Sequence, residues 1–459
     1  MSDLGRIVKA YDVRGTVPDQ LNADIARAIG AAMVQTLRAG GERVDQIVMA
    51  HDMRDSSPGL AAAFAEGAQA EGVDLIDAGL GSTDLLYYAS GSLDMPGAMF
   101  TASHNPAQYN GIKMCRAAAL PIGQDTGLAE IRDRAQSILD GGKGPGGPVG
   151  GLEKRDLLSA YAGHLRSLVD LSGIRKLRVV VDAGNGMGGH TVPAVLGDAV
   201  LPALPLEIIP LYFELDGSFP NHEANPLEPA NIVDLQRAVR EHHADIGIAF
   251  DGDADRCYVV DADANPVTPS AITALVATRE LAKHPGAMII HNLITSRAVP
   301  EIVREHGGQP VRTRVGHSFI KEQMAHTGAV FGGEHSAHYY FKDFWGADTG
   351  MLAAMHVLAA LGEQDKPLSE LVAQFSRYAA SGEINSTVGD QTATMAAVRE
   401  AFSDAEIDEL DGLTLTFPDG AWANLRPSNT EPLVRLNVEA PTEERMAEVR
   451  DAVLRVARG

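Results

Sequence analysis

Apolar residues near the start of the chain recur at two spacings that alternate along the sequence. One stripe has the spacing of an α-helix and consists of Ile25, Ile29, Met33 and Leu37. Asn22 is suited to cap this helix, and the Ser-Pro pair at 57–58 is suited to open a second one. Short apolar runs at 46–50, 73–76 and 96–100 predict buried strands. Strands that alternate with helices predict a parallel α/β sheet, which is expected to end at the polar loop after residue 100.

The same alternation begins again twice farther along the chain. A segment rich in Gly and Pro at 141–151 predicts a flexible surface loop or linker. The apolar run at 177–181 predicts the first strand of a second α/β unit, and the run at 245–250 predicts its last strand. A third unit is expected to follow, with a strand at 287–291 and a helix at 352–361.

The final part of the chain changes character. Runs at 413–417, 421–425 and 434–438 are short, apolar and separated by tight turns, which predicts an α+β domain with an antiparallel sheet. The Pro-Thr pair at 441–442 is suited to cap a closing helix. At 459 residues the chain is also too long for one hydrophobic core, so three or four domains are expected.

The acidic composition narrows the classes of partner. The formal net charge is −23 and the pI is about 5.0. An acidic surface repels phosphate backbones, which argues against nucleic acid as a partner. A small anionic substrate would instead need a local cluster of Lys, Arg and His side chains.

Cysteine usage and the first residues predict the cellular compartment. Cys115 and Cys257 lie in different motif regions and form no CxxC pattern, which predicts free thiols in a reducing compartment. The first residues lack an apolar signal region, and no stretch is long and apolar enough to span a bilayer. These features predict a cytoplasmic protein with no membrane partner.

A polar hexapeptide, Thr-Ala-Ser-His-Asn-Pro at 101–106, follows the predicted strand at 96–100. Its turn-forming composition is expected to present the Ser103 hydroxyl to a cleft. His104 and Lys113 then supply a possible base and a possible clamp for an anion, which is the arrangement of an activated nucleophile. The alternative is an ordinary polar turn, because Ser, Asn and Pro are common turn residues.

Three carboxylates at alternate positions, Asp251, Asp253 and Asp255, follow the apolar run that ends at residue 250. Such a set can converge on one hard cation, and so few carboxylate ligands favour Mg²⁺. A calcium loop would need a glutamate at its twelfth position, where this chain has Ala262. Arg256 is a natural partner for phosphate. A charged surface turn is the alternative, but carboxylates this close repel one another unless they are neutralised.

A glycine-rich loop, Gly-Gly-Glu-His-Ser-Ala-His at 332–338, carries groups that suit recognition of a polyol. A metal site through His335 and His338 is the rival interpretation. Upstream, the Gly-His-Ser segment at 316–318 and Lys321 add polar groups of the same kind.

The segment Arg-Pro-Ser-Asn-Thr-Glu-Pro at 426–432 lies between two predicted strands of the last domain. An arginine followed by Ser, Asn and Thr, with backbone N–H groups in a turn, predicts a phosphate-binding nest. The segment is also a hairpin connection, which leaves its binding role open.

Five segments together resemble the α-D-phosphohexomutase superfamily. They are YDVRG at 11–15, TASHNP at 101–106, DGDADR at 251–256, GGEHSAH at 332–338 and RPSNTEP at 426–432. The segments follow the order of that superfamily and extend over almost the whole chain. Within it, the last two segments look most like those of phosphomannomutases or of dual phosphomannomutase/phosphoglucomutases, since phosphoglucosamine mutases usually carry Gly where Asn429 stands.

The resemblance implies an α/β protein of four domains around a central cleft. Three similar domains with mixed or parallel sheets are expected, followed by an α+β domain that is mobile. The expected boundaries are 1–150, 151–252, 253–365 and 366–459.

The resemblance also implies roles for residues of each domain. Ser103 is expected to be the phosphorylated nucleophile, and the other expected catalytic residues are His104, Lys113, Arg256 and Arg14. The expected ligands of Mg²⁺ are the Ser103 phosphate, Asp251, Asp253 and Asp255. The expected contacts to the sugar are His317, Glu334, Ser336 and His338. The expected clamp on the non-reacting phosphate consists of Arg426, Ser428, Asn429 and Thr430.

The implied activity is the reversible conversion of mannose 6-phosphate to mannose 1-phosphate through a phosphoserine enzyme and a hexose 1,6-bisphosphate. Phosphoglucomutase or dual specificity is the alternative. Ile294 stands where some dual-specificity members have a lysine, which leaves the sugar specificity open, and Arg297 is a candidate for the compensating cation. A sugar-phosphate phosphatase and a non-enzymatic sensor are rivals. The expected partners are small hexose phosphates, and the protein is expected to be a monomer or dimer.

Overall fold

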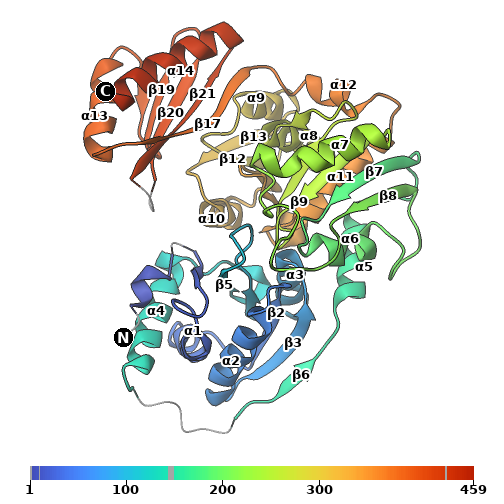
Figure 1. Ribbon diagram of the computed structural model, residues 1–459, viewed down its shortest axis with the longest axis vertical. Helices are drawn as coiled ribbons and strands as arrows, with labels where there is room; N and C mark the ends of the chain where they lie inside the picture. The colour runs from blue at the N-terminus through green and yellow to red at the C-terminus, as the bar shows by residue number, and fades with distance from the viewer. Residues whose placement is uncertain (1–2, 10, 143–148, 429–431) are drawn as a thin grey trace.

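Four sheets follow one another along the chain, and helices pack against each of them (Figure 1). The computed structural model describes residues 3–9, 11–142, 149–428 and 432–459. Three of the sheets are mixed and the C-terminal one is antiparallel throughout. The predicted fold of three similar α/β domains and a C-terminal α+β domain is therefore confirmed.

The first sheet has the strand order β1-β5-β4-β2-β3-β6. Its strands are β1 Val13–Thr16, β2 Gln46–His51, β3 Asp74–Leu80, β4 Gly97–Phe100, β5 Tyr109–Cys115 and β6 Leu152–Lys154. Its helices are α1 Ala23–Ala39, α2 Ser57–Ala70, α3 Thr83–Leu93 and α4 Leu128–Leu139. The Asn22 side chain caps α1 by accepting from the backbone N–H of Ile25 at 3.1 Å, as predicted.

Two expectations for this first sheet are wrong. The sheet does not end at the polar loop after β4, because that loop reverses the chain and β5 pairs antiparallel with both β4 and β1. The sheet is therefore mixed. Residues 152–154 also belong here, since β6 pairs parallel with β3, although the segment was assigned to the second domain.

Helices α1 and α2 touch backbone to backbone, and small residues make this possible. A Cβ atom at Gly67 would lie 1.9 Å from the carbonyl oxygen of Arg27. Gly59, on the same helix, has no other atom within 4 Å of the corresponding position.

We expect Gly67→Ala to lower the melting temperature by several degrees, because overpacking a close crossing costs about 1–3 kcal/mol. The control Gly59→Ala should leave the melting temperature unchanged or raise it slightly, since Ala is the better helix former by up to ~1 kcal/mol. Thermal unfolding followed by circular dichroism measures both. Equal melting temperatures for the two variants would contradict this packing.

The second sheet has the order β11-β10-β9-β7-β8. Its strands are β7 Leu177–Asp182, β8 Leu206–Leu211, β9 Ile246–Phe250, β10 Cys257–Val260 and β11 Pro266–Val267, and its helices are α5 Leu158–Leu168, α6 Gly188–Val195 and α7 Val233–Glu241. The prediction that residues 245–250 form the last strand is wrong, because β10 and β11 continue the sheet as antiparallel strands. The expected boundary between 252 and 253 falls inside the β9–β10 hairpin.

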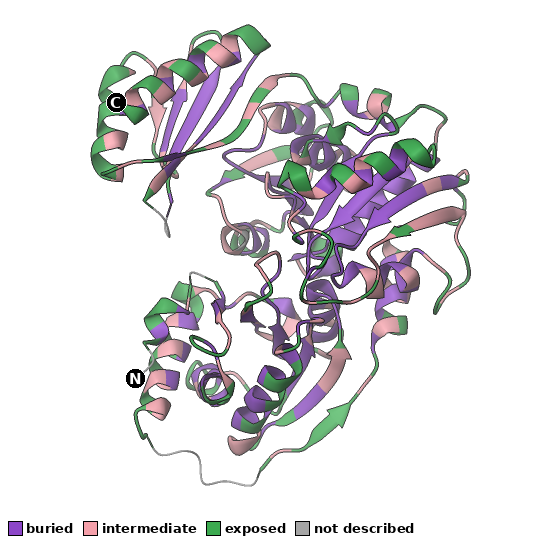
Figure 2. Ribbon diagram, in the orientation of Figure 1, coloured by how far each residue is buried: buried purple, intermediate pink, exposed green. Residues whose placement is uncertain are grey.

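The third sheet has the order β13-β12-β14-β15-β16. Its strands are β12 Met288–Asn292, β13 Gln309–Thr313, β14 Phe331–Gly333, β15 Tyr339–Phe341 and β16 Ala347–Asp348. Its helices are α8 Pro269–Lys283, α9 Ala298–Glu305, α10 His317–Thr327, α11 Gly350–Gly362 and α12 Leu368–Ala373. The second and third units share one continuous apolar core, which appears as the large buried region in Figure 2.

The fourth sheet has the order β17-β21-β20-β19-β18 and its own core. Its strands are β17 Ala379–Thr387, β18 Glu406–Asp408, β19 Leu413–Thr416, β20 Trp422–Pro427 and β21 Leu433–Ala440, and its helices are α13 Gln391–Ala401 and α14 Glu443–Arg458. Thr442 caps α14 as predicted, by accepting from the backbone N–H of Arg445 at 3.2 Å. Figure 1 shows this unit beside the third unit and at the opposite end of the molecule from most of the first.

Among the helices that the structure describes, none combines the length and the apolar character needed to cross a membrane.

Candidate active site

The Ser103 loop leaves the end of β4 and turns sharply beneath the site. Ser103 has a left-handed backbone conformation, with φ of 49°, and its backbone N–H donates to Thr101 Oγ1 at 2.9 Å. The side chain is aimed at the second unit, where the Ser103 hydroxyl donates to Asp251 Oδ2 at 2.7 Å. Two predicted segments, 148 positions apart in the sequence, therefore meet at one hydroxyl.

The three carboxylates of the β9–β10 turn converge as predicted. Asp251, Asp253 and Asp255 are all buried, and one oxygen from each lies within 4.8 Å of the others. Asp253 Oδ1 is buried and has no hydrogen-bond partner among the described residues. Buried carboxylate oxygens without a donor are suited to a hard cation, so this triad can bind a metal ion.

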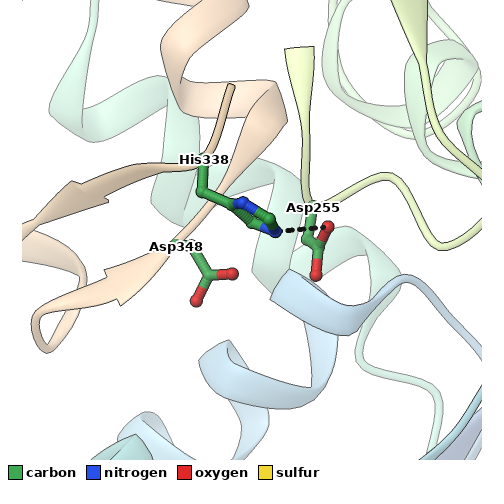
Figure 3. A group of neighbouring side chains, drawn as sticks. All are labelled: Asp255, His338 and Asp348. Carbon is green, nitrogen blue, oxygen red and sulfur yellow. Dashed lines mark ion pairs between the residues drawn. The ribbon is translucent and has the colours of Figure 1, made fainter. Parts of the chain in front are cut away.

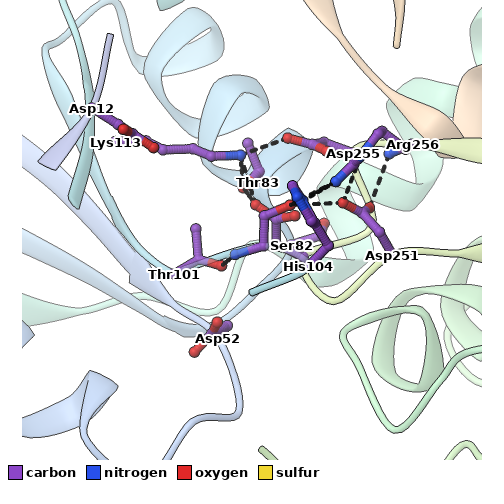
Figure 4. A network of polar contacts seen from close by, with 12 residues as sticks. Asp12, Asp52, Ser82, Thr83, Thr101, His104, Lys113, Asp251, Asp255 and Arg256 are labelled. Atoms are coloured by element: carbon purple, nitrogen blue, oxygen red, sulfur yellow. Dashed lines mark hydrogen bonds and ion pairs between the residues drawn. The ribbon is translucent and has the colours of Figure 1, made fainter. Parts of the chain in front are cut away.

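Lys113 lies between two of these carboxylates (Figure 4). Its Nζ is 2.7 Å from Asp253 Oδ2 and 2.6 Å from Asp255 Oδ2. The Thr83 hydroxyl donates to the same Asp253 oxygen at 2.6 Å. Burial alone would raise the pKa of Asp253, but the nearby ammonium group of Lys113 lowers that pKa overall. The lysine therefore holds this carboxylate in its charged form.

Arg256 links the carboxylate turn to the serine loop. Its Nε donates to Asp251 Oδ2 at 2.8 Å, and one terminal nitrogen lies 3.4 Å from Ser103 Oγ. That same nitrogen contacts Nδ1 of His104. Burial raises the pKa of Asp251 to about 7, assisted by the neighbouring carboxylates and opposed by Arg256.

His104 is held as a neutral imidazole. Burial, together with the guanidinium groups of Arg256 and Arg14, lowers the pKa of His104 well below its usual value. Its Nδ1 lies 3.3 Å from the Ser103 hydroxyl. Arg14 reaches the same loop by donating to the side chain of Asn105. His104 and Arg256 thus contact the serine side chain, Arg14 contacts the serine loop, and Lys113 contacts the adjoining carboxylates.

The 332–338 loop is the β14–β15 hairpin. Glu334 is 2% exposed and accepts from the hydroxyls of Tyr340 and Ser336, the latter at 3.3 Å. His338 Nε2 lies 3.6 Å from Asp255 Oδ1, so this hairpin adjoins the carboxylate turn (Figure 3).

The rival metal site through His335 and His338 is not formed in the described part of the chain. His338 instead groups with Asp255 and Asp348. Lys321 Nζ lies 2.5 Å from Asp348 Oδ1 and already neutralises that carboxylate. The hairpin therefore presents polar groups and no separate metal site of this kind.

A cavity of about 300 Å³ lies over Ser103 and is lined by all four units. Arg14 and Lys113 come from the first unit, Arg256 from the second, Glu334, Ser336 and His338 from the third, and Arg435 from the fourth. The lining includes four Lys or Arg side chains and two His beside three carboxylates, those of Asp255, Glu334 and Asp348, in a chain that is strongly acidic overall. The local cluster of cations needed for an anionic substrate is therefore present.

The arginine of the predicted phosphate nest, Arg426, lines an adjoining cavity. Arg426 lines a space of about 640 Å³ that shares Tyr11, Val315 and Gly316 with the Ser103 cavity. Its guanidinium group pairs with Glu383 at 3.2 Å, and Arg435 pairs with the other oxygen of that carboxylate at 3.1 Å.

Some of the predicted contacts to substrate lie partly or wholly outside the described residues. Ser428 is buried, and its backbone N–H donates to the carbonyl of Leu433 at 2.9 Å. Asn429 and Thr430 lie outside the described residues. His317 begins α10, but its side chain is outside the description.

Ile294, which stands where some dual-specificity members have a lysine, lies away from Ser103. Ile294 lines a small cavity between the third and fourth units. Arg297 donates to the carbonyl of Gly420 in the fourth unit. Neither residue lines the cavity over Ser103.

The motifs do not include four residues that shape the site. They are Arg54, Thr83, Glu383 and Arg435. Arg54 offered a usable signal, since it follows the buried strand β2 in the polar segment His-Asp-Met-Arg at 51–54. The others lie within ordinary helix and strand patterns.

Four family models match the chain in order. They are described as phosphoglucomutase/phosphomannomutase alpha/beta/alpha domain I over residues 5–140, domain II over 159–264, domain III over 268–378, and the C-terminal domain over 383–456.

Relatives extend along nearly the whole chain. A protein of Xanthomonas campestris named "Phosphohexose mutases" is 42% identical over 447 residues, which is 96% of each chain. The phosphomannomutase of Escherichia coli K12 is 39% identical over 97% of each chain. Among solved structures, a phosphoglucomutase/phosphomannomutase family protein of Burkholderia thailandensis superposes with a TM-score of 0.89 at 33% identity, covering 100% of this chain and 98% of that one.

Proposed function

This chain belongs to the phosphoglucomutase/phosphomannomutase family and is an isomerase that transfers phosphate intramolecularly, and we propose that it interconverts mannose 6-phosphate and mannose 1-phosphate. The relatives named phosphomannomutase support mannose as the sugar. Glucose phosphate, alone or alongside mannose phosphate, is the alternative substrate.

One observation carries the proposed chemistry. The Ser103 hydroxyl lies 2.7 Å from Asp251 Oδ2, at the edge of a carboxylate triad that can bind a metal ion. A serine in this position can carry a phosphoryl group whose oxygens complete the metal site. We propose that Asp251, Asp253 and Asp255 hold Mg²⁺, which would neutralise charge on the transferring phosphoryl group.

The cations around Ser103 have complementary tasks in this proposal. Phosphoryl transfer requires in-line placement and neutralised oxygen charge more than covalent assistance. Arg256 lies 3.4 Å from the serine oxygen and supplies charge at the reacting end. Lys113 holds two carboxylates through its ammonium group and keeps the triad compact. The neutral His104, 3.3 Å from the hydroxyl, can accept or return its proton.

The two adjoining cavities suit a substrate with a phosphate at each end. We propose that phosphoserine donates to the sugar phosphate, which forms a hexose 1,6-bisphosphate. The intermediate then turns end for end and returns its other phosphate to Ser103. Arg426 lies in the second cavity and is proposed to bind the phosphate that is not reacting.

We propose a coupled assay with the 1-phosphates of mannose, glucose and glucosamine as the test of substrate. Mannose 1-phosphate should be converted fastest and glucose 1-phosphate more slowly, because no identified residue reads carbon 2. Glucosamine 1-phosphate should be poor. A clear preference for glucosamine 1-phosphate would contradict this assignment.

Arg426→Ala should raise KM for mannose and glucose phosphates by similar factors. The arginine would contact phosphate, which both sugars share, and a charge-assisted pair of hydrogen bonds contributes about 1.5–3 kcal/mol. The surface variant Arg445→Ala loses ion pairs with Asp419 and Glu448 and a cation–π contact with Phe417, all within the same unit. It is the matched control and should keep the wild-type KM. Steady-state kinetics on both sugars measures the effect.

Glu334→Gln should lower kcat/KM for both sugars as well, because carbons 3 and 4 carry the hydroxyl groups that both share. The factor by which Glu334→Gln lowers kcat/KM should change less with salt concentration than the factor for Arg426→Ala, since Glu334 would contact neutral hydroxyl groups and Arg426 a charged phosphate. The kcat/KM of either variant could instead fall far more for one sugar phosphate than for the other. Carbon 2 would then be recognised at that residue, and the assignment of Arg426 to phosphate and Glu334 to shared hydroxyl groups would be wrong.

Two rivals make different predictions. A phosphatase would release inorganic phosphate, whereas a mutase conserves sugar phosphate. A sensor would bind hexose phosphate without turnover, and the complete set of Ser103 and three carboxylates argues against it.

We also propose that the protein is cytoplasmic, that it is a monomer or dimer, and that its four domains follow the four sheets, with the second boundary after Val267.

A further inference from the structure

We infer that Arg54 is a positioning residue for Ser103, which sets the direction of the serine hydroxyl by holding the loop's backbone carbonyls. The inference rests on the proposed function, because its consequence is measured as phosphoryl transfer. Arg54 lines neither of the two cavities at the site. Its effect on catalysis must therefore pass through the loop and not through contact with substrate.

Every N–H group of the Arg54 side chain is used, and the residue is 2% exposed. Nε donates to Asp52 Oδ2 at 3.2 Å. The four remaining N–H groups donate to backbone carbonyls, those of Pro106 and Tyr109 at 2.9 Å each, Ser103 at 2.9 Å and Asn105 at 2.7 Å. One rigid planar group thus fixes carbonyls from both ends of the serine loop.

This arrangement explains how a serine can keep an unfavourable backbone conformation. Ser103 has φ of 49°, a left-handed conformation that is unfavourable for a non-glycine residue unless its surroundings hold it there. The Arg54 bond to the Ser103 carbonyl holds that carbonyl on the inner side of the loop. The side chain is then left on the outer side, where its hydroxyl meets Asp251.

Arg54 is itself held from two sides. Within the first unit, Asp52 Oδ1 accepts from the Arg54 backbone N–H at 3.0 Å and from the Ser57 hydroxyl at 2.5 Å. From the second unit, the Phe219 ring covers the guanidinium carbon at 5.0 Å from the ring centroid. Gly217 also approaches closely, since a Cβ there would lie 2.7 Å from the Arg54 Cα. Serine-loop geometry therefore depends on how the first two units dock.

Lysine cannot replace this group, because it has one nitrogen where arginine has a planar fork. Arg54→Lys keeps the positive charge beside Asp52 but loses most of the carbonyl bonds. The matched control is Arg166→Lys, since Arg166 also donates to three backbone carbonyls, those of Val195, Gly197 and Pro202, and lines neither cavity. Both variants lose hydrogen bonds from an arginine to backbone carbonyls, but only Arg54→Lys affects the serine loop.

The experiment compares kcat, KM and melting temperature of the two variants in the presence of hexose 1,6-bisphosphate. Arg54→Lys should lower kcat by about 100-fold, which is the scale expected for a misplacement of about 1 Å, with KM changed less than about threefold. Arg166→Lys should lower the melting temperature with kcat within about twofold of wild type. An Arg54→Lys enzyme whose kcat falls no more than that of Arg166→Lys overturns the inference.

A second variant decides the case if Arg54→Lys does not fold. Phe219→Leu keeps an apolar cover but removes the cation–π contact, and kcat should fall about three- to tenfold at unchanged KM. A wild-type kcat in a folded Phe219→Leu enzyme then overturns the inference. Failure of the proposed function is distinguishable, because the wild-type protein itself would show no mutase activity.

Discussion

Ser103→Ala is expected to reduce mutase turnover by about four orders of magnitude or more, because it removes the atom that carries the phosphoryl group. The fold should remain, since the Ser103 hydroxyl makes one short bond, to Asp251, and two longer contacts, to His104 and Arg256, and the loss of one such bond costs about 1 kcal/mol. Intact-mass spectrometry should detect a phosphate-sized adduct on the wild-type protein after incubation with hexose 1,6-bisphosphate, and none on the variant.

The control for this variant is Ser92→Ala. Ser92 lies on α3, and its hydroxyl donates locally to the carbonyl of Ala89 at 3.4 Å. The Ser92→Ala variant should keep wild-type turnover and should still show the phosphate-sized adduct by mass spectrometry. Full activity in Ser103→Ala would contradict the assignment of Ser103 as the nucleophile.

Asp253→Asn is expected to lower kcat by about three orders of magnitude and to weaken Mg²⁺ binding strongly. The substitution removes one unit of charge from the triad and places an amide beside the Lys113 ammonium, which lies 2.7 Å from Asp253 Oδ2 in the native protein. Chelation of the wild-type enzyme should abolish activity as well, and added Mg²⁺ should restore it. Titration calorimetry with Mg²⁺ and steady-state kinetics measure the two effects.

Asp263→Asn is the matched control, because Asp263 is an exposed carboxylate on the turn between β10 and β11. It should change neither Mg²⁺ affinity nor turnover. If the chelated wild-type enzyme remains fully active, the carboxylates serve a purpose other than metal binding.

The sequence was most informative where local chemistry determines the structure. Asn22 and Thr442 are helix caps whose bonds reach three residues along the chain, so the pattern around them is enough to place α1 and α14. The carboxylates of the β9–β10 turn likewise belong to one short segment, and their convergence follows from their spacing. Such features require no knowledge of distant parts of the chain.

The errors came from pairing between strands. Nothing within the segments that form β5 and β10 indicates the direction in which each strand runs through its sheet. Their antiparallel pairing is set by the reversals at the serine loop and at the carboxylate turn. The boundary expected at 252 failed for the same reason, because it separates strands that share a sheet.

Arg54 illustrates the remaining limit. Four of its partners are backbone carbonyls about fifty positions away, and every residue type, proline and glycine included, carries the same backbone oxygen. A residue that accepts a hydrogen bond through its backbone carbonyl can have any side chain, so the sequence does not identify it as a partner. Only the position of a charged residue at the end of a buried strand hinted at a role.

The central claim is that phosphate passes from Ser103 to the sugar and back without reaching water. The most direct test is a single turnover in which enzyme carrying radiolabelled phosphoserine is mixed with excess unlabelled mannose 1-phosphate. The account predicts that the label leaves Ser103 and is recovered in hexose 1,6-bisphosphate and mannose 6-phosphate. Recovery of the label as inorganic phosphate, or its retention on the protein, would contradict the account.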